Sequence, residues 1–160
     1  MREQYKVGIL GATGMVGQRF ATLLNRHPWF QVTALAASAR SAGKTYEEAV
    51  GGRWAMTEPM PECMKQMVVL DAGKVEEVAR LVDFVFCAID LDKAATRALE
   101  EAYAKAEVPV VSNNSANRGV DDVPMVIPEI NPGHLKVIAA QRRRLGTRRG
   151  FVAVKPNCSL

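Results

Sequence analysis

Few of the features that mark specialised protein classes occur in this sequence. No apolar run approaches the roughly 18 residues of a membrane span, so we expect no segment to cross a bilayer. The opening stretch, MREQYKVGIL, lacks the cationic and then apolar layout of a secretory signal, and it lacks a small-residue cleavage site. The sequence therefore predicts a cytoplasmic location and no membrane partner.

Cysteine and histidine are also scarce. The chain has three cysteines, Cys63, Cys87 and Cys158, without a CxxC spacing and without a histidine pair nearby. Zinc sites need closely spaced thiol or imidazole ligands, and disulfide scaffolds need paired cysteines. We therefore expect no metal site, and the unpaired cysteines indicate a reducing compartment.

What remains is the composition of an ordinary globular protein of 160 residues, 48% hydrophobic and 24% charged. That length is sufficient to bury about two thirds of the unfolded surface in one domain. The formal net charge is +4, but it would be −1 without five arginines of one late stretch: Arg142, Arg143, Arg144, Arg148 and Arg149. Because no aromatic residues interleave with them, we expect a solvated helix end or a partner contact and no nucleic acid. An arginine-patch nucleic-acid binder is kept as an alternative.

Strand-like and helix-like segments alternate along the chain. Short β-branched and apolar runs predict strands over 5–10, 31–37, 67–70, 83–89, 108–111 and 151–154. The stretches between them predict helices over 15–25, 74–81, 91–106 and 131–138, the last with Asn131 as N-cap and Pro132 in the first turn. Residues 38–61 predict a loop with one short helix around Glu47, and 112–123 a polar loop. This order predicts an α/β fold: a Rossmann-like, doubly wound, mostly parallel sheet with helices on both faces and ligands at the carboxyl ends of the strands.

A glycine-rich turn follows the first predicted strand. Gly11, Gly14 and Gly17 form G-x-x-G-x-x-G between that strand and the first predicted helix. Such a turn lets the backbone approach a pyrophosphate closely and offers it the free N–H groups of a helix N-terminus. We interpret it as a dinucleotide site, to which the Thr13 hydroxyl can add a phosphate contact. The alternative is a plain strand-to-helix turn with packing glycines.

The residues after the second predicted strand favour NADP over NAD. NAD sites place an acidic residue there for the ribose 2′-hydroxyl, but this strand ends in Ala36 and Ala37, and no acid appears before Glu47. Hydroxyls and cations stand where NADP has its extra phosphate: Ser38, Arg40, Ser41 and Lys44. The alternative is that the two cations only keep a loop solvated.

Cys158 stands in the sequence PNCS after the last predicted strand. At a strand-to-helix junction the helix N-terminus favours a thiolate, and this site would face the nicotinamide end of the dinucleotide groove. A single cysteine taken alone is more often a small buried apolar residue, so both interpretations stand at this point.

Several segments together resemble one enzyme family. GATGMVGQRF, HPWF at 27–30, SARSAGK at 38–44, Ser112-Asn113, VPMVIPEINPGHL and PNCS are similar to aspartate-semialdehyde dehydrogenases, above all their archaeal and fungal branch. The resemblance implies an NADP-dependent interconversion of L-aspartyl 4-phosphate and L-aspartate 4-semialdehyde, in the biosynthesis of lysine, methionine and threonine. The related reductases of N-acetyl-glutamyl phosphate, malonyl-CoA or succinyl-CoA remain alternatives, as does an NADP-binding module without catalysis.

The resemblance also implies roles for individual residues. Cys158 is the expected nucleophile that forms a thioester, Asn157 a candidate donor to the developing oxyanion, and Arg118 the expected ligand of the substrate phosphate. The residues expected to bind NADP are Gly11, Thr13, Gly14, Met15, Val16, Gly17, Ser38, Arg40, Ser41, Lys44, Cys87, Ser112 and Asn113.

The predicted organisation has two parts. Residues 1–154 are expected to form the NADP-binding Rossmann domain, and residues 155–160 to lead the catalytic cysteine toward a second domain that family members have beyond this point. That domain would supply an acid/base histidine, an arginine for the substrate carboxylate and most of a homo-oligomer interface. We therefore expect the chain alone to bind NADP weakly and to turn over substrate negligibly.

Overall fold

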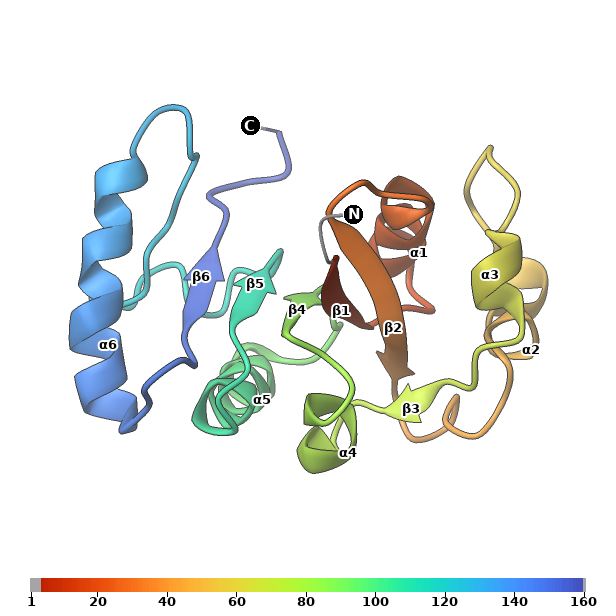
Figure 1. Cartoon of the computed structure of the whole chain (residues 1–160), viewed down its shortest axis with the longest axis horizontal. Helices are drawn as coiled ribbons and strands as arrows, with labels where there is room; N and C mark the ends of the chain where they lie inside the picture. The colour runs from red at the N-terminus through yellow and green to blue at the C-terminus, as the bar shows by residue number, and fades with distance from the viewer. Residues whose placement is uncertain (1–3, 160) are drawn as a thin grey trace.

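Six parallel strands form one sheet in the order β3-β2-β1-β4-β5-β6 (Figure 1). The computed structural model describes residues 4–159; residues 1–3 and Leu160, at the outer ends of the two predicted segments, lie outside the described residues. The strands are β1 (Tyr5–Leu10), β2 (Phe30–Ala37), β3 (Leu70–Asp71), β4 (Phe84–Cys87), β5 (Val110–Ser112) and β6 (Val152–Val154). The order reverses at β1, which lies between β2 and β4, so the predicted doubly wound parallel sheet is confirmed.

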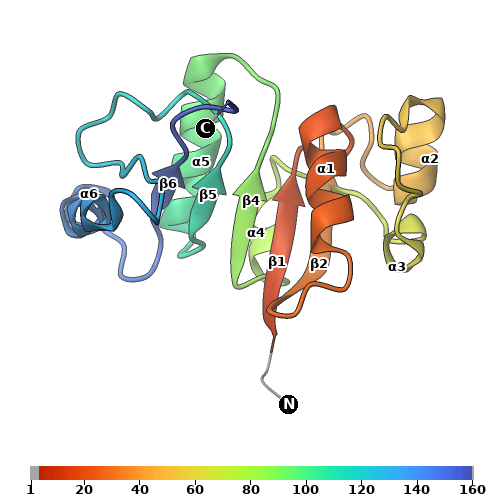
Figure 2. The same cartoon turned by 90° about the horizontal axis from the view of Figure 1, so that it is seen from above.

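Helices lie on both sides of this sheet, as predicted. In Figure 1 the helix α1 lies above the row of strands, and α4 and α5 lie below it; Figure 2 gives the same arrangement from above. The helical segments are α1 (Met15–Leu24), α2 (Tyr46–Val50), η1 (Gly51–Arg53), α3 (Glu62–Lys65), α4 (Val75–Ala79), α5 (Lys93–Lys105), η2 (Pro132–Val137) and α6 (Ile138–Leu145).

Alternate strand residues supply two separate cores, because successive side chains point to opposite faces of a sheet. Along β4, Val85 and Cys87 belong to the core under α5, whereas Phe84 and Phe86 pack into the core on the α1 side. The α1 side is less completely covered over β5, where Val111 is 39% exposed. Phe84 and Phe86 therefore lie beside a less covered part of the sheet, on the side that carries α1.

The apolar residues of α1 do not all face the sheet. The helix rests on the sheet through buried Gly17, Ala21 and Leu24, whereas Val16 and Leu23 are exposed. The helical spacing of apolar residues thus predicts the helix correctly. These apolar residues lie on two faces of α1, of which only one is buried within residues 4–159.

Three segments differ from the prediction. The strand predicted over 67–70 is wrong in extent: β3 is Leu70–Asp71, while Val68 makes an isolated antiparallel bridge to Thr45 and Met67 O accepts from Tyr46 N–H. These apolar residues pair with the chain before α2 in place of β2. The four-residue α3 falls in a stretch where no helix is predicted.

The third correction concerns the helix predicted over 131–138. It begins as the 3₁₀ segment η2 and continues as α6 to Leu145, where Gly146 ends it in a left-handed conformation. The Asn131 side chain does not cap this helix; it accepts from Ile127 N–H and donates to Met125 O. The Asn131 side-chain amide therefore bonds within a local turn and does not act as an N-cap.

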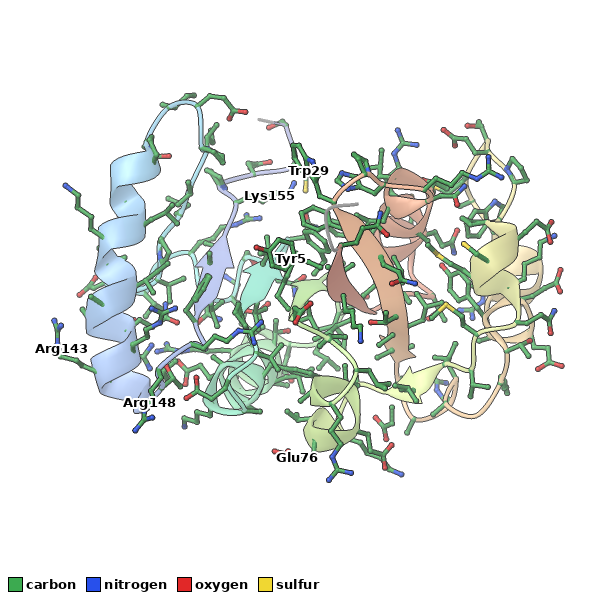
Figure 3. All side chains as sticks on the ribbon, in the orientation of Figure 1. Tyr5, Trp29, Glu76, Arg143, Arg148 and Lys155 are labelled. Atoms are coloured by element: carbon green, nitrogen blue, oxygen red, sulfur yellow. The ribbon has the colours of Figure 1, made fainter. Side chains whose placement is uncertain are left out.

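The late arginines are largely engaged in contacts within the chain. Arg142 lies over the Phe151 ring, and Arg144 forms ion pairs with Asp122 and Glu101. Arg143 and Arg148 project from the outer edge of the molecule beside α6 (Figure 3). No helix among residues 4–159 is long and apolar enough to cross a membrane.

Candidate functional site

The glycine turn joins β1 to α1 and has no room for side chains at two of its three glycines. Gly11 has a positive φ of 83°, and a Cβ there would lie 2.9 Å from Ile89 Cα. A Cβ on Gly17 would lie 2.7 Å from Ala12 Cα and closer still to Gly11 O. At Gly14, by contrast, a Cβ would meet only Gly11 O, at 3.6 Å. The turn is thus closed toward the protein and open at Gly14, the N-cap of α1, where the first helical N–H groups lack intrahelical partners.

Two buried polar side chains hold this turn from below. The Tyr46 hydroxyl donates to Ala12 O at 2.8 Å, and Gln18 Nε2 donates to Thr13 O at 3.0 Å. Tyr46 is fully buried and Gln18 is 2% exposed. Burial raises the pKa of the Tyr46 hydroxyl, so it stays a donor throughout the physiological range. Neither residue is predicted from the sequence, because nothing in the local pattern links Tyr46 or Gln18 to the turn.

A groove of about 880 Å³ extends from the glycine turn along the carboxyl ends of β2, β3 and β4. Gly11, Thr13 and Gly14 line it at the turn, and Ser38 and Arg40 line it beyond β2. This is the position at which doubly wound sheets bind nucleotides, beside the strand where the order reverses. The structure thus brings together these five predicted cofactor residues.

Other predicted cofactor residues lie outside this groove. Lys44 is exposed on the same loop but does not line it, and Ser41 is half-buried, with its N–H donating to Ser38 O. Gly17 is buried beneath the turn. Their assignment to NADP stays a prediction.

The groove also contains charged residues that are not predicted from the sequence. The cation is Arg53, whose guanidinium donates to Ala49 O and Val50 O at the end of α2. Asp71 and Asp90 line the groove as well, and Asp71 accepts from Gly73 N–H. The only sequence signal for Arg53 is that it follows the glycine pair that ends α2.

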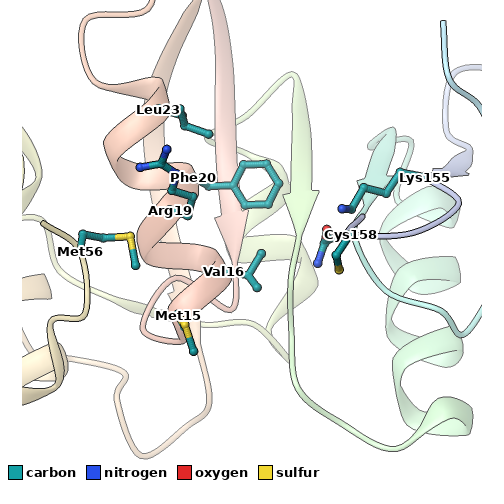
Figure 4. A pocket seen from close by; sticks show the side chains of 9 residues that line it. Met15, Val16, Arg19, Phe20, Leu23, Met56, Lys155 and Cys158 are labelled. Atoms are coloured by element: carbon teal, nitrogen blue, oxygen red, sulfur yellow. The ribbon is translucent and has the colours of Figure 1, made fainter. Parts of the chain in front are cut away.

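A second cavity of about 580 Å³ lies on the α1 side of the glycine turn. Figure 4 shows the apolar side chains of α1 on one side of it and Lys155 and Cys158 on the other. Met15 and Val16 line it from the first turn of α1, and Asn113 lines it from the end of β5. Four predicted site residues, Met15, Val16, Asn113 and Cys158, therefore share one cavity with Lys155, which was not predicted.

Cys158 lies in a turn that follows β6. Asn157 Oδ1 accepts from Ser159 N–H and Oγ–H, both at 3.2 Å. The donor group of the same side chain is its Nδ2 amide. Lys155 Nζ donates to Asn157 O at 3.3 Å. Cys158 is exposed, and its sulfur is free.

The remaining predicted residues lie just behind this cavity. Arg118 Nε donates to Lys155 O at 3.1 Å, and its Nη2 donates to Asn113 O at 3.2 Å, which uses two of the five guanidinium donors. Ser112 and Cys87 are buried and line neither space, so their contact with the cofactor stays a prediction. Burial, with the nearby Glu100 carboxylate, raises the pKa of the Cys87 thiol and keeps it protonated.

The groove and the Cys158 cavity adjoin at the glycine turn. Gly14 lines the groove and the next residue, Met15, lines the cavity that contains Cys158. A dinucleotide laid across Gly14 would therefore have one end beside Ser38 and Arg40 and the other beside Cys158. Among residues 4–159 no group of histidine, cysteine and carboxylate side chains is suited to a metal ion.

Comparison with known proteins gives a consistent result. The family model described as "Semialdehyde dehydrogenase, NAD binding domain" matches residues 6–138. Aspartate-semialdehyde dehydrogenase from Archaeoglobus fulgidus is 45% identical over 158 residues, which are 98% of this chain and 43% of the relative; the enzyme from Methanothermobacter thermautotrophicus is 46% identical over 153 residues, 96% of this chain and 42% of the relative. The crystal structure of aspartate semialdehyde dehydrogenase with NADP from Candida albicans has a TM-score of 0.84 and 40% identity, covering 98% of this chain and 44% of that one. The chain thus spans less than half the length of the relatives it matches.

Proposed function

The chain belongs to the semialdehyde dehydrogenase family through its NAD-binding domain, and from this premise we propose that it is the cofactor-binding and nucleophile-bearing part of an NADP-dependent aspartate-semialdehyde dehydrogenase. The proposed reaction converts L-aspartyl 4-phosphate and NADPH into L-aspartate 4-semialdehyde, phosphate and NADP. The proposal rests mainly on one observation: the glycine turn and Cys158 lie at the same edge of the sheet and line adjoining spaces.

In the proposed mechanism the Cys158 thiolate is the nucleophile. Its sulfur attacks the acyl carbon, phosphate leaves with the electron pair of the broken C–O bond, and a thioester remains on Cys158. When bound, NADPH supplies the hydride that reduces this thioester to the aldehyde and returns the thiolate. Asn157 Nδ2 is the proposed donor to the developing oxyanion, and Arg118 the proposed ligand of the phosphate, for which a guanidinium fork is suited.

The residues of the groove fit NADP better than NAD. Gly14 leaves the space in which a pyrophosphate can approach the backbone, and the N-terminus of α1 favours an anion there. Ser38 and Arg40 follow β2, where NAD sites have a carboxylate, and Arg53 adds a second cation to the same groove. We therefore include Arg53 with Ser38 and Arg40 among the proposed contacts of the cofactor phosphates.

Titration calorimetry with NADPH and NADH side by side tests the cofactor. We expect NADPH to bind more tightly, and the Ser38→Ala/Arg40→Ala double variant to lose that preference while NADH binding changes little. Lys65→Ala is the matched control, because it removes a cation that lines neither space. Equal affinities of the parent chain for the two nucleotides would refute the choice of NADP.

The activity of the complete protein is part of the same proposal, since the matched relatives are more than twice as long. We propose that residues outside this chain supply proton transfer and recognition of the substrate carboxylate, and that the complete protein is a cytoplasmic homo-oligomer. The expected result is negligible turnover by the 160-residue chain and full turnover when the chain is extended or mixed with the remainder. Sustained oxidation of the semialdehyde by this chain alone would contradict the proposal.

Two alternatives make different predictions. A related acyl reductase would turn over N-acetyl-glutamyl phosphate or an acyl-CoA in preference to aspartyl phosphate once the chain is extended. A non-catalytic NADP-binding module would bind NADPH and never show turnover with any of these substrates, even in its extended form.

A further inference from the structure

A buried carboxylate lies beneath the loop that borders the Cys158 cavity. Glu100, on α5, is fully buried in the core between this helix and the sheet. Within the described part of the chain no cation is paired with it; its neighbours are hydrogen-bond donors. A buried charge without such donors is costly, so the local structure must supply them.

All three donors come from residues 112–118, the last residue of β5 together with the loop that follows it. Ser112 Oγ–H and Asn114 Nδ2 donate to Glu100 Oε1, the latter at 3.1 Å, and Asn117 Nδ2 donates to Oε2 at 2.6 Å. Hydrogen bonds to a charged acceptor are about twice as strong as neutral ones. The loop 112–118 is thus fastened at three points to a single side chain of a packed helix.

The same loop holds the chain that leads to Cys158. Ser112 O accepts from Lys155 N–H at 3.3 Å, and Arg118 Nε donates to Lys155 O at 3.1 Å, so both backbone groups of Lys155 are bound by this loop. Asn113, between the fastened residues, lines the cavity with Cys158. A continuous set of hydrogen bonds therefore runs from α5 to a residue three positions before the nucleophile.

We propose that Glu100 is a positioning residue for the Cys158 site: it touches neither space, and it fixes the location of Asn113 and of the 155–158 segment through the loop 112–118. The inference rests on the proposed function only in treating Cys158 as the reacting group. The anchoring of the loop 112–118 by Glu100 does not depend on catalysis and is testable without turnover.

Hydrogen exchange of the 160-residue chain tests the anchoring. Glu100→Met keeps a side chain of similar length but leaves the three donors without their acceptor, and it should speed exchange at the amides of Asn113, Asn114 and Lys155 by about tenfold or more. Exchange at Val85, in the central sheet, should not change. Glu100→Gln keeps one acceptor oxygen, and its amide can donate to Asn117 Oδ1, which is buried and has no partner in the described structure, so it should restore most of the protection.

Thr96→Val is the matched control, because Thr96 is also a buried polar residue of α5, but its hydroxyl donates to Leu91 O, away from the loop 112–118. Equal exchange in Glu100→Met and Thr96→Val, or a uniform increase over the whole sheet, would overturn the proposal. If Glu100→Met does not fold, Asn114→Ala removes one donor at a partly exposed position and should give the same local pattern at smaller size; no change at Asn113 and Lys155 would then count against it.

A second readout separates this proposal from the proposed function. In a Cys63→Ser background, saturating NADPH should protect Cys158 from a small alkylating reagent, and Glu100→Met should lose that protection while its calorimetric affinity for NADPH stays within about twofold of the parent. Absence of protection in the parent chain would count against the proposed function, and the exchange result would still decide the role of Glu100. Full protection in Glu100→Met would overturn the positioning role.

Discussion

Alanine substitutions at Gly14 and Gly17 should separate the fold of the turn from its binding function. At Gly17 the new methyl group would lie 2.7 Å from Ala12 Cα, well inside the ordinary contact distance of two carbon atoms. Overpacking of this kind costs about 1–3 kcal/mol of unfolding free energy. For a domain of this size that is a fall of roughly 2–12 °C in melting temperature.

Gly14→Ala is the matched substitution with the opposite expectation. Gly14 has φ −78° and ψ 166°, which alanine adopts without strain, and a Cβ there meets no atom closer than 3.6 Å. Loss of the glycine N-cap costs about 0.5–1 kcal/mol, and the lower entropy of the unfolded chain restores about 0.4–1 kcal/mol, so the two nearly cancel. The methyl group nevertheless stands where a pyrophosphate would approach, and we expect NADPH affinity to fall at least about tenfold, which is 1.4 kcal/mol.

Calorimetric titration and thermal unfolding of both variants check these numbers. If Gly14→Ala binds NADPH as tightly as the parent, the open side of the turn is not the phosphate site. A Gly17→Ala variant as stable as the parent would equally show that the turn relaxes around an added side chain.

Three further predictions concern stability and association. Tyr46→Phe removes the donor to the buried Ala12 O and should cost about 1–1.5 kcal/mol in thermal unfolding, with weaker NADPH binding; an unchanged melting temperature would show that the turn does not depend on this bond. The hydrogen-bonded Arg144 guanidinium holds the pKa of Asp122 below its usual value, so this contribution to stability is complete above the unfolded pKa of about 3.9 and is lost as the pH falls below it. Arg144→Ala should therefore flatten the acid branch of the stability curve measured by denaturant titration, and an unaltered branch would contradict this. The exposed apolar face of α1 should make the chain self-associate, and Leu23→Gln should shift sedimentation velocity toward the monomer; a parent that stays monomeric at high concentration would be contrary to expectation.

The sequence predicts well those elements whose signals are local. The apolar runs at β1, β2 and β4 and the glycine turn each carry their pattern within ten residues. The structure has β1 and β2 within one residue of the predicted bounds, whereas β4 ends two residues before the predicted strand end. The strand prediction over 67–70 is wrong in extent because Met67 and Val68 are apolar, as in a strand, but pair with residues at the start of α2 that lie more than 20 positions away. Periodicity also could not tell which of the two apolar faces of α1 is buried.

For the site, the sequence predicts residues whose chemistry and position coincide with a known pattern. Gly14, Ser38 and Cys158 each follow a strand, and the ends of parallel strands meet at one edge. Residues that act by long-range contact have no local sequence pattern that identifies them. From the sequence, Gln18 is an ordinary helix residue and Glu100 is one of several charged residues on an amphipathic helix. Their roles depend on burial, which only the packed structure reveals.

The support that Tyr46 gives to Ala12 has a consequence for protein engineering. The two residues are 34 positions apart in sequence, so the seven residues from Gly11 to Gly17 do not include the hydroxyl that binds the carbonyl of the turn. Transplanting these seven residues into another strand-to-helix junction would transfer the glycine pattern without the hydrogen bond from Tyr46 that supports the turn. A recipient scaffold would need its own hydroxyl group, placed on a neighbouring helix to donate to the carbonyl of the turn, before the transplanted motif could bind a phosphate tightly.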